Sequence, residues 1–169
     1  MNELVTKARK HAEEAHRDQK YGLCPYLRHL EDVAAIVASH GDEAMAIAYL
    51  HDVLEDVKGA TVRELVETFG TKIAECVKIC TDEPGENRPE RKRKTNAKMA
   101  GVKGDLEIAL VVKAADRLAN VRESVRSSLL DPDNKHLPKY RAEHPEFRLA
   151  AHRPGLCDEI WAELDKLLS

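Results

Sequence analysis

Residues 46–57, AIAYLHDVLEDV, place four titratable side chains inside an otherwise apolar run. Helical spacing would stack His51 over Glu55 and Asp52 over Asp56, so that all four groups share one stripe of a helix. Three carboxylates packed this closely repel one another and lose hydration, and a cation relieves both costs. The stretch therefore predicts a partly buried helix that contributes to a divalent-metal site. The pair Glu55 and Asp56 would be available for chemistry beside the metal.

The composition indicates a single helical domain. The chain has 169 residues, enough for one domain with a sizeable core. Only 4% of them are aromatic, so Leu, Val, Ile and Ala must fill that core. Charged residues make up 34%, which is typical of amphipathic helices with solvated outer faces. The net charge of −3 argues against general nucleic-acid binding but leaves room for a local basic pocket.

Several features favour a cytoplasmic protein that is not inserted in a membrane. No apolar stretch approaches the ~20 residues of a membrane span. The N-terminus, MNELVTK, lacks the apolar core of a signal peptide. The four cysteines form no CxxC pair, and we expect them to be reduced core or surface thiols.

Apolar periodicity predicts helices joined by short turns and no strand-like alternation. The expected helices cover residues 2–19, 25–40, 42–59, 61–70, 71–81, 106–130, 136–150 and 156–168, with a loop at 82–89, a basic helical stretch after it and a turn at 131–134. Asn2, Thr61, Thr71 and Asp105 are suited to cap helices, and Pro25 suits a first helical turn. Residues 1–169 are therefore expected to form one all-α domain.

His51 and Asp52 cannot complete a coordination shell alone, so further ligands must come from other helices. Two candidates stand out: His29, on the preceding helix, and Asp116, a polar group inside another apolar helical run. Asn120 shares the helix face of Asp116 at i+4. Two imidazoles and two carboxylates make a mixed nitrogen and oxygen site suited to Mn²⁺, Fe²⁺ or Zn²⁺, with positions left for water or substrate.

These residues resemble the HD phosphohydrolase superfamily, whose metal ligands follow the pattern H…HD…D. His29, the stretch HDVLED at 51–56 and the stretch KAADRLANVR at 113–122 are similar to the hydrolase domain of the RelA/SpoT enzymes. In length the chain is similar to the stand-alone members of that family, the small alarmone hydrolases. The resemblance runs from about residue 8 to 125 and implies an HD-superfamily helical bundle with a metal site in its core.

The resemblance also implies an activity. It is that of a Mn²⁺-dependent enzyme that removes the 3′-pyrophosphate of (p)ppGpp, giving GDP or GTP. The roles it implies are metal ligation by His29, His51, Asp52 and Asp116, activation or orientation of the attacking water by Glu55 and Asp56, and nucleotide contact by Asn120. Spacing does not settle which of the acidic pair is the base. Like-charge repulsion is expected to raise the pKa of one of them.

A polyanionic substrate requires cations near the metal, and one basic cluster follows the loop at 82–89. Its members are Arg88, Arg91, Lys92, Arg93 and Lys94. The cluster could be a solvated helix face or a patch for a partner, but relatives have a similar basic stretch whose residues approach the phosphates. The resemblance therefore favours substrate binding, for which we single out Arg88 and Lys92. Lys113, Arg117 and Arg122 are further candidates.

The chain departs from the family pattern at two positions. Lys20 stands where relatives commonly have an arginine that contacts the base, and lysine lacks the planar fork of arginine. Leu30 follows the first histidine, where the family usually has proline. Tyr140 matches by its offset a tyrosine that packs on substrate in relatives, and a core tyrosine is an equal interpretation. Base preference stays open: (p)ppApp competes with (p)ppGpp, and NADPH 2′-dephosphorylation is a more distant alternative.

Two other functions are compatible with the pattern. One is an HD nucleotidase that acts on mononucleotides, and the other is a non-catalytic nucleotide sensor or a protein that acts by binding a partner. No companion synthetase domain is visible, so we expect degradation of alarmone without synthesis. The sequence does not indicate the oligomeric state.

Overall fold

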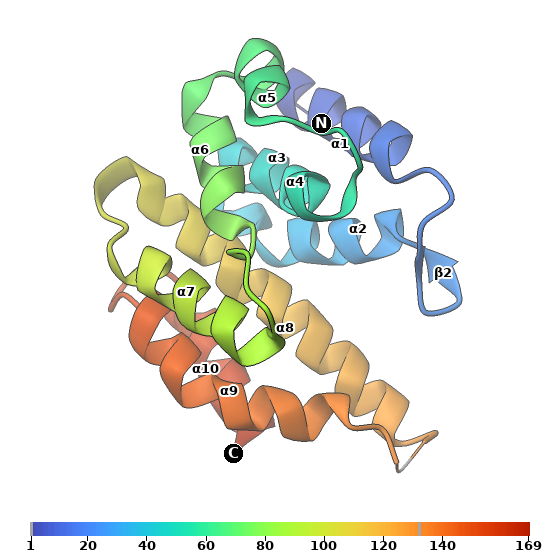
Figure 1. Ribbon diagram of the computed structural model, residues 1–169, viewed down its shortest axis with the longest axis vertical. Coiled ribbons are helices and arrows are strands. Elements are labelled where there is room, and N and C mark those ends of the chain that lie inside the picture. Colours follow the sequence, from blue (N-terminus) through green and yellow to red (C-terminus); the bar gives the residue numbers. More distant parts are fainter. Residues whose placement is uncertain (1, 132) are drawn as a thin grey trace.

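The computed structural model describes residues 2–131 and 133–169 and shows a helical protein with one very small sheet (Figure 1). In chain order its elements are α1 (Glu3–His16), β1 (Lys20–Tyr21), β2 (Cys24–Pro25), α2 (Leu27–Ile36), η1 (Ala38–His40), α3 (Asp42–Leu50), α4 (Val53–Asp56), α5 (Val62–Phe69), α6 (Thr71–Cys80), α7 (Arg88–Ala100), η2 (Gly104–Glu107), α8 (Ile108–Ser128), α9 (His136–Ala151) and α10 (Asp158–Leu168). The predicted all-α class is confirmed. The turn predicted at 131–134 includes Pro132, which lies outside the described residues.

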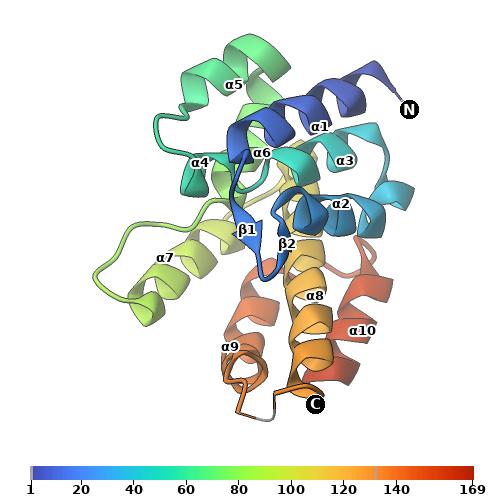
Figure 2. The same ribbon diagram turned by 90° about the vertical axis from the view of Figure 1, so that its right-hand side faces the viewer.

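Helix α8 runs between two groups of helices (Figures 1 and 2). On one side it contacts α2, α3 and α6, and on the other it contacts α9 and α10. Because neighbours surround its first half, residues 109–115 are all buried and show no exposed stripe. Among the described residues no helix, α8 included, is both long and apolar enough to cross a membrane.

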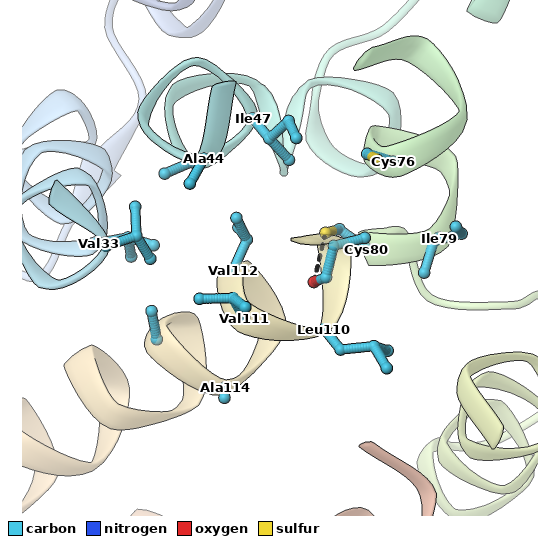
Figure 3. Packing of buried hydrophobic residues seen from close by; sticks show 14 of the residues in the cluster. Val33, Ala44, Ile47, Cys76, Ile79, Cys80, Leu110, Val111, Val112 and Ala114 are labelled. Carbon is cyan, nitrogen blue, oxygen red and sulfur yellow. Dashed lines mark hydrogen bonds between the residues drawn. The ribbon is translucent and has the colours of Figure 1, made fainter. Parts of the chain in front are cut away.

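Aliphatic side chains and alanines fill the core, as the low aromatic content predicts. Figure 3 shows Val111 and Val112 of α8 facing Val33 of α2 and the α3 residues Ala44 and Ile47. All five are at most 1% exposed. Full burial of a side chain the size of valine or isoleucine contributes roughly 1.5–3 kcal/mol. Contacts of this kind hold α8 against the N-terminal helices and fix the position of the residues it carries.

The cysteines are thiols of the kind expected. Cys76, Cys80 and Cys157 are buried, Cys24 is exposed, and all four are free. The Cys80 Sγ donates a weak hydrogen bond to the Ala109 carbonyl (Figure 3). Burial raises the pKa of Cys80 to about 12, so this thiol is unreactive at neutral pH.

Two of the predicted helix caps are confirmed. The Asn2 side chain accepts a hydrogen bond from the N–H of Leu4 and begins α1. The Thr61 hydroxyl accepts one from the N–H of Glu64 and begins α5. Such caps satisfy backbone donors that have no partner within the helix, and each contributes about 1 kcal/mol.

Three predicted helix starts are wrong. Thr71 is the first residue of α6 and not its cap, because the chain turns at Gly70, whose φ of 87° is unfavourable for residues with a side chain. Asp105 lies within η2 and caps no helix, and α8 begins at Ile108, two residues after the predicted start at Leu106. Pro25 belongs to β2, where it pairs with Lys20 across an antiparallel hairpin that we did not predict. The helix expected from residue 25 therefore begins at Leu27.

Candidate metal centre

The helix expected over residues 42–59 is interrupted at the His-Asp pair, which corrects that prediction. Helix α3 ends at Leu50 and α4 begins at Val53. The His51 Nδ1 donates to the Ala48 carbonyl at 2.7 Å, which is the carbonyl that a continuous helix would pair with the N–H of Asp52. His51 is consequently fully buried, whereas Asp52 lines a cleft.

Four side chains from three parts of the chain converge at this interruption. The His51 Nε2 lies 3.0 Å from Asp52 Oδ2 and 3.6 Å from Asp116 Oδ1. The His29 Nε2, from α2, lies 3.3 Å from Asp116 Oδ1 and 3.8 Å from Asp52 Oδ2. The structure therefore brings all four predicted ligands together, with Asp116 supplied by the central helix α8.

The separations between imidazole nitrogens and carboxylate oxygens suit a divalent cation. Donor atoms bound at ~2.1 Å and separated by angles of ~90–110° lie about 3.0–3.4 Å apart, and the four nitrogen–oxygen distances observed are 3.0–3.8 Å. One donor atom each from His29, His51 and Asp116 lies within 4.8 Å of the other two. With its Nδ1 engaged by Ala48, His51 turns a buried Nε2 toward two carboxylates, and this atom has no hydrogen-bond partner in the part of the chain that the structure describes. Two imidazoles and two carboxylates also form the donor set that Mn²⁺, Fe²⁺ and Zn²⁺ accept.

The imidazoles and carboxylates of the centre stabilise one another's charged forms, although all of them are buried or partly buried. Burial by itself would lower the pKa of His51, but the charges of Asp52 and Asp116 outweigh it and raise that pKa well above its ordinary value. Burial would likewise raise the pKa of Asp52, yet His51 lowers it to about 2. The pKa of Asp116 is also lowered, because His29 and His51 outweigh the effect of burial. Both carboxylates therefore stay ionised at neutral pH, the form that binds a cation.

The acidic pair lies beside this centre, but the four-residue stripe predicted from helical spacing does not form. His51 is in the core, while Glu55 and Asp56 are exposed and line the cleft. Only Asp52 and Asp56 keep the one-turn spacing, since the N–H of Asp56 donates to the Asp52 carbonyl at 2.9 Å. The Asp56 Oδ2 accepts a hydrogen bond from the Gln19 side-chain amide at 2.9 Å.

Glu55 shows the raised pKa that was expected for one of the pair. Desolvation of its carboxyl group in the cleft is the main cause. The backbone N–H of Asp82 donates to Glu55 Oε2 at 2.9 Å and opposes the rise, while the negative charge of Asp82 adds to it. Desolvation, more than the predicted repulsion within the pair, therefore moves Glu55 toward the pKa of a useful base.

The cleft above the centre has a volume of about 180 Å³, and cations form one wall of it. These are Arg88 and Lys92 of α7 and Lys113 and Arg117 of α8. Lys92 pairs with Asp82 at 2.6 Å, and the buried Lys113 lies 3.8 Å from the same carboxylate. The carboxylate of Asp82 thus holds two of the four cations in place at the cleft.

Some of the predicted basic residues lie elsewhere. Lys20 is exposed on β1 and does not line the cleft. Arg91, Arg93 and Lys94 are also outside its lining, and Lys94 pairs with Glu90 on its own helix. Arg122 lies at a separate groove, where it pairs with Glu163 at 2.7 Å. On an α-helix only about one side chain in four faces a given wall, so a basic run places few of its members there.

Asn120 and Tyr140, the remaining predicted substrate contacts, line the cleft. The Asn120 Nδ2 donates to Asp116 Oδ1 at 2.6 Å, so in this structure the amide holds a predicted metal ligand. The Tyr140 ring lies under the Arg117 guanidinium, with 4.9 Å from the Arg117 Cζ to the ring centroid. Tyr140 is half-buried, lines the cleft and also packs against the hydrophobic core, so both interpretations of this residue keep support.

Several residues of the site were not predicted. Tyr26 donates its hydroxyl to Asp52 Oδ2 at 2.6 Å, and Glu143 of α9 accepts hydrogen bonds from both Arg88 and Arg117. Tyr26 precedes His29 by three residues, a spacing that places both on one helix face and could have indicated it. For Glu143 and Asp82 the sequence holds no such signal, because their partners are distant along the chain.

An all-α bundle that gathers two imidazoles and two carboxylates between its helices, with one His-Asp pair adjacent in sequence, has the architecture of the HD phosphohydrolases. The chain belongs to the HD-domain family, whose model, described as "HD domain", matches residues 8–137. This match covers α2, the α3–α4 junction and α8, the elements that carry the four converging side chains. The predicted family is therefore confirmed.

Relatives carry the similarity further. Over 126 residues the chain is 30% identical to the guanosine-3′,5′-bis(diphosphate) 3′-pyrophosphohydrolase MESH1 of Drosophila melanogaster, covering 71% of this chain and 66% of that protein. Over 179 aligned residues it is 29% identical to the putative chloroplastic GTP diphosphokinase RSH1 of Oryza sativa subsp. japonica, covering 98% of this chain but only 18% of that protein. The chain thus spans just under two thirds of the fly protein and about a fifth of the rice protein.

A solved structure shows the same fold. It belongs to a metazoan ortholog of SpoT that is described as hydrolysing ppGpp and playing a role in starvation responses. The two structures align with a TM-score of 0.82 over 99% of this chain and 94% of the other, at 22% sequence identity. The likeness confirms the predicted HD-type helical bundle.

Proposed function

We propose that this chain is a metal-dependent hydrolase that removes the 3′-pyrophosphate of (p)ppGpp, giving GDP or GTP and pyrophosphate, with Mn²⁺ as its metal. One observation carries the proposal: the Nε2 atoms of His29 and His51 each lie 3.0–3.8 Å from a carboxylate oxygen of Asp52 and of Asp116, at a cleft that is also lined by four cations. The names printed for the fly relative and for the related structure supply the substrate class. The four free thiols fit a cytoplasmic site of action.

His29, His51, Asp52 and Asp116 would hold the metal. When bound, a divalent cation lowers the pKa of a coordinated water toward neutrality and neutralises charge that develops on a phosphoryl group. The protein's own contribution is to keep both carboxylates ionised and to fix the His51 ring through its bond to Ala48.

Glu55 and Asp56 act on the attacking water in different ways. Glu55 accepts the proton of the attacking water, because its raised pKa makes it a stronger base than an ordinary carboxylate. Asp56, held by the Gln19 amide, orients the same water. The N–H of Asp82 holds the Glu55 carboxylate in place, so the carboxylate is already oriented for proton transfer.

The cationic wall binds the phosphates. Lys92 and Lys113 share the Asp82 carboxylate. A phosphate oxygen that enters the cleft can bind both ammonium groups while they stay paired with Asp82, so no ion pair has to be broken first. Arg88 and Arg117 are presented by Glu143 in the same way. We assign the nucleoside to Asn120 and Tyr140, which also line the cleft. We assign no base contact to Lys20, since it is exposed away from the cleft.

A product assay tests the proposal. Purified protein is incubated with ppGpp, ppApp or NADPH, with and without Mn²⁺, and pyrophosphate and phosphate are measured separately. We expect pyrophosphate from ppGpp only when Mn²⁺ is present, and loss of that activity in Asp52→Ala. Asp105→Ala, which removes an exposed carboxylate in η2, is the matched control and should retain activity.

Each other outcome contradicts a defined part of the proposal. Release of phosphate alone would indicate a mononucleotide phosphatase or an enzyme acting on NADPH, and turnover of ppApp in place of ppGpp would change the base. Tight nucleotide binding without turnover, unaffected by Glu55→Gln, would indicate a non-catalytic sensor.

A further inference from the structure

One short segment, residues 19–26, contains the β1–β2 hairpin and reaches the metal centre with two tyrosine hydroxyls. Tyr26 donates to Asp52 Oδ2 at 2.6 Å, and Tyr21 donates to Asn120 Oδ1 at 2.7 Å. Figure 2 shows the hairpin lying across the junction between the N-terminal helices and α8. Neither tyrosine has a role in the reaction proposed above.

Tyr26 acts on the oxygen that faces both imidazoles. Asp52 Oδ2, the acceptor of its hydroxyl, is the atom that lies 3.0 Å from His51 Nε2 and 3.8 Å from His29 Nε2. A hydroxyl at this distance fixes the rotation of the carboxylate, so that the same oxygen always points to the centre.

Tyr21 acts on the second carboxylate through an amide. Asn120 accepts the Tyr21 hydroxyl with its Oδ1 and donates with its Nδ2 to Asp116 Oδ1 at 2.6 Å. A turned amide would place its oxygen against the Asp116 carboxylate and its NH₂ group against the hydroxyl, so the tyrosine selects the orientation that supports Asp116. The Tyr21 ring also stacks on His29, with 4.7 Å between centroids and 22° between planes.

The hairpin has a rigid base for this task. His16, the last residue of α1, is buried and stacks on Tyr26 with 4.7 Å between ring centroids and 20° between planes. Its Nδ1 lies 2.8 Å from Gln19 Oε1. The start and the end of the segment are therefore both attached to α1, and its two hydroxyls have little freedom to move.

We propose that Tyr26 and Tyr21 are positioning residues that hold the two carboxylate ligands of the metal centre in their binding orientation, Tyr26 directly and Tyr21 through Asn120. The inference rests on the metal centre of the proposed function. Outer hydrogen bonds to metal-binding carboxylates orient them, and losing one typically costs about 10–100-fold in metal affinity. The two hydroxyls should therefore affect the affinity for Mn²⁺ itself, before any substrate is present.

The test is a titration of the full chain with Mn²⁺ alone, in which calorimetry measures the affinity and electron paramagnetic resonance measures the spectrum of the bound ion. We expect Tyr26→Phe to weaken Mn²⁺ binding about tenfold or more, and Tyr21→Phe to weaken it less because it acts through Asn120. The Mn²⁺ spectrum should also change, since it reports the arrangement of ligands and not the stability of the fold. Both variants keep their rings and hence their stacking on His16 and His29.

Tyr49→Phe is the matched control. It removes the same hydroxyl from a buried tyrosine of α3 outside the lining of the cleft, and its Mn²⁺ affinity should equal that of the wild type. Thermal unfolding of each variant establishes that binding is measured on folded protein.

The failures of the two proposals are distinguishable. If the wild type does not bind Mn²⁺, or Asp52→Asn binds it equally well, the metal centre itself is refuted. If the wild type binds Mn²⁺ and a Tyr→Phe variant shows the same affinity and the same spectrum, the centre stands and the positioning role of that tyrosine is overturned.

Discussion

Replacing Glu143 by glutamine should destabilise the protein and weaken the cationic wall of the cleft. The Glu143 carboxylate accepts hydrogen bonds from Arg88 at 2.7 and 3.1 Å and from Arg117 at 3.0 Å. Arg117 is only 7% exposed, and its guanidinium lies 4.6 Å from the Phe147 ring centroid. Glu143→Gln keeps the shape of the side chain but removes the charge that compensates this buried cation.

The magnitude follows from the unequal burial of the two arginines. The Arg88 side chain is 33% exposed, so its pair contributes only ~0–1 kcal/mol. Stranding a fully buried charge costs about 3–5 kcal/mol. The cost at Arg117 is smaller than that because aromatic faces remain beside the guanidinium and glutamine still offers one acceptor. We expect a total loss of about 2–3 kcal/mol, which lowers Tm by roughly 5–10 °C in a domain of this size.

The pH dependence gives a second, independent check. Burial would raise the pKa of Glu143, but the hydrogen bonds and charges of Arg88 and Arg117 outweigh it and lower that pKa. A lowered folded pKa stabilises the protein above the unfolded value of ~4.3, and this stabilisation is lost as pH falls through the folded pKa. The free energy of unfolding of Glu143→Gln should therefore differ most from that of the wild type at pH 7, and the difference should shrink progressively below about pH 4.

Thermal unfolding followed by circular dichroism across this pH range measures both quantities. Glu146→Gln, on the same helix but exposed, is the control and should unfold with the wild type. A Glu143→Gln variant that unfolds within 1–2 °C of the wild type at pH 7, or a difference that widens as pH falls, would refute the reasoning.

Three further perturbations have defined outcomes. Leu110→Ala, at a fully buried position of α8, should cost about 2–5 kcal/mol in urea unfolding because it leaves a cavity; a loss below 1 kcal/mol would mean that the core collapses around the site. Asn87→Ala removes the cap that accepts the N–H of Glu90 at 3.0 Å, and should cost about 1 kcal/mol and raise KM for the proposed substrate by loosening the turn that carries Arg88. Mn²⁺ at about 100 times its Kd should raise Tm by roughly 5–10 °C, and Asp116→Asn should remove most of that shift; equal shifts in both proteins would place the bound metal elsewhere.

Local signals in the sequence predicted the helices well, and interactions with distant residues account for the errors. Asn2 and Thr61 act as caps because a cap depends on residues two or three positions away. The interruption after Leu50 was missed because Val53 and Leu54 continue the helical spacing of apolar residues. It depends on the His51 ring and the Ala48 carbonyl, an interaction that apolar periodicity does not reveal.

The candidate site divides in the same way. His29, His51, Asp52 and Asp116 were selected from the sequence and lie together in the structure, while their role as ligands remains a prediction. The residues that support them could not be selected, because Tyr21 and Asn120 are 99 residues apart in the sequence and no helical or strand period relates them. An offset taken from relatives placed Lys20 at the substrate, whereas the short hairpin directs it to solvent.

The position of α8 has a consequence for the order in which the molecule is made. His29 and the His51–Asp52 pair belong to the first third of the chain, but the carboxylate that completes the centre comes with α8. In the proposed metal centre, the earlier residues would therefore retain an ion only after the ribosome has released that helix. Ion binding would then be a late event that reports docking of α8, and a nascent N-terminal fragment would lack one of the four proposed ligands.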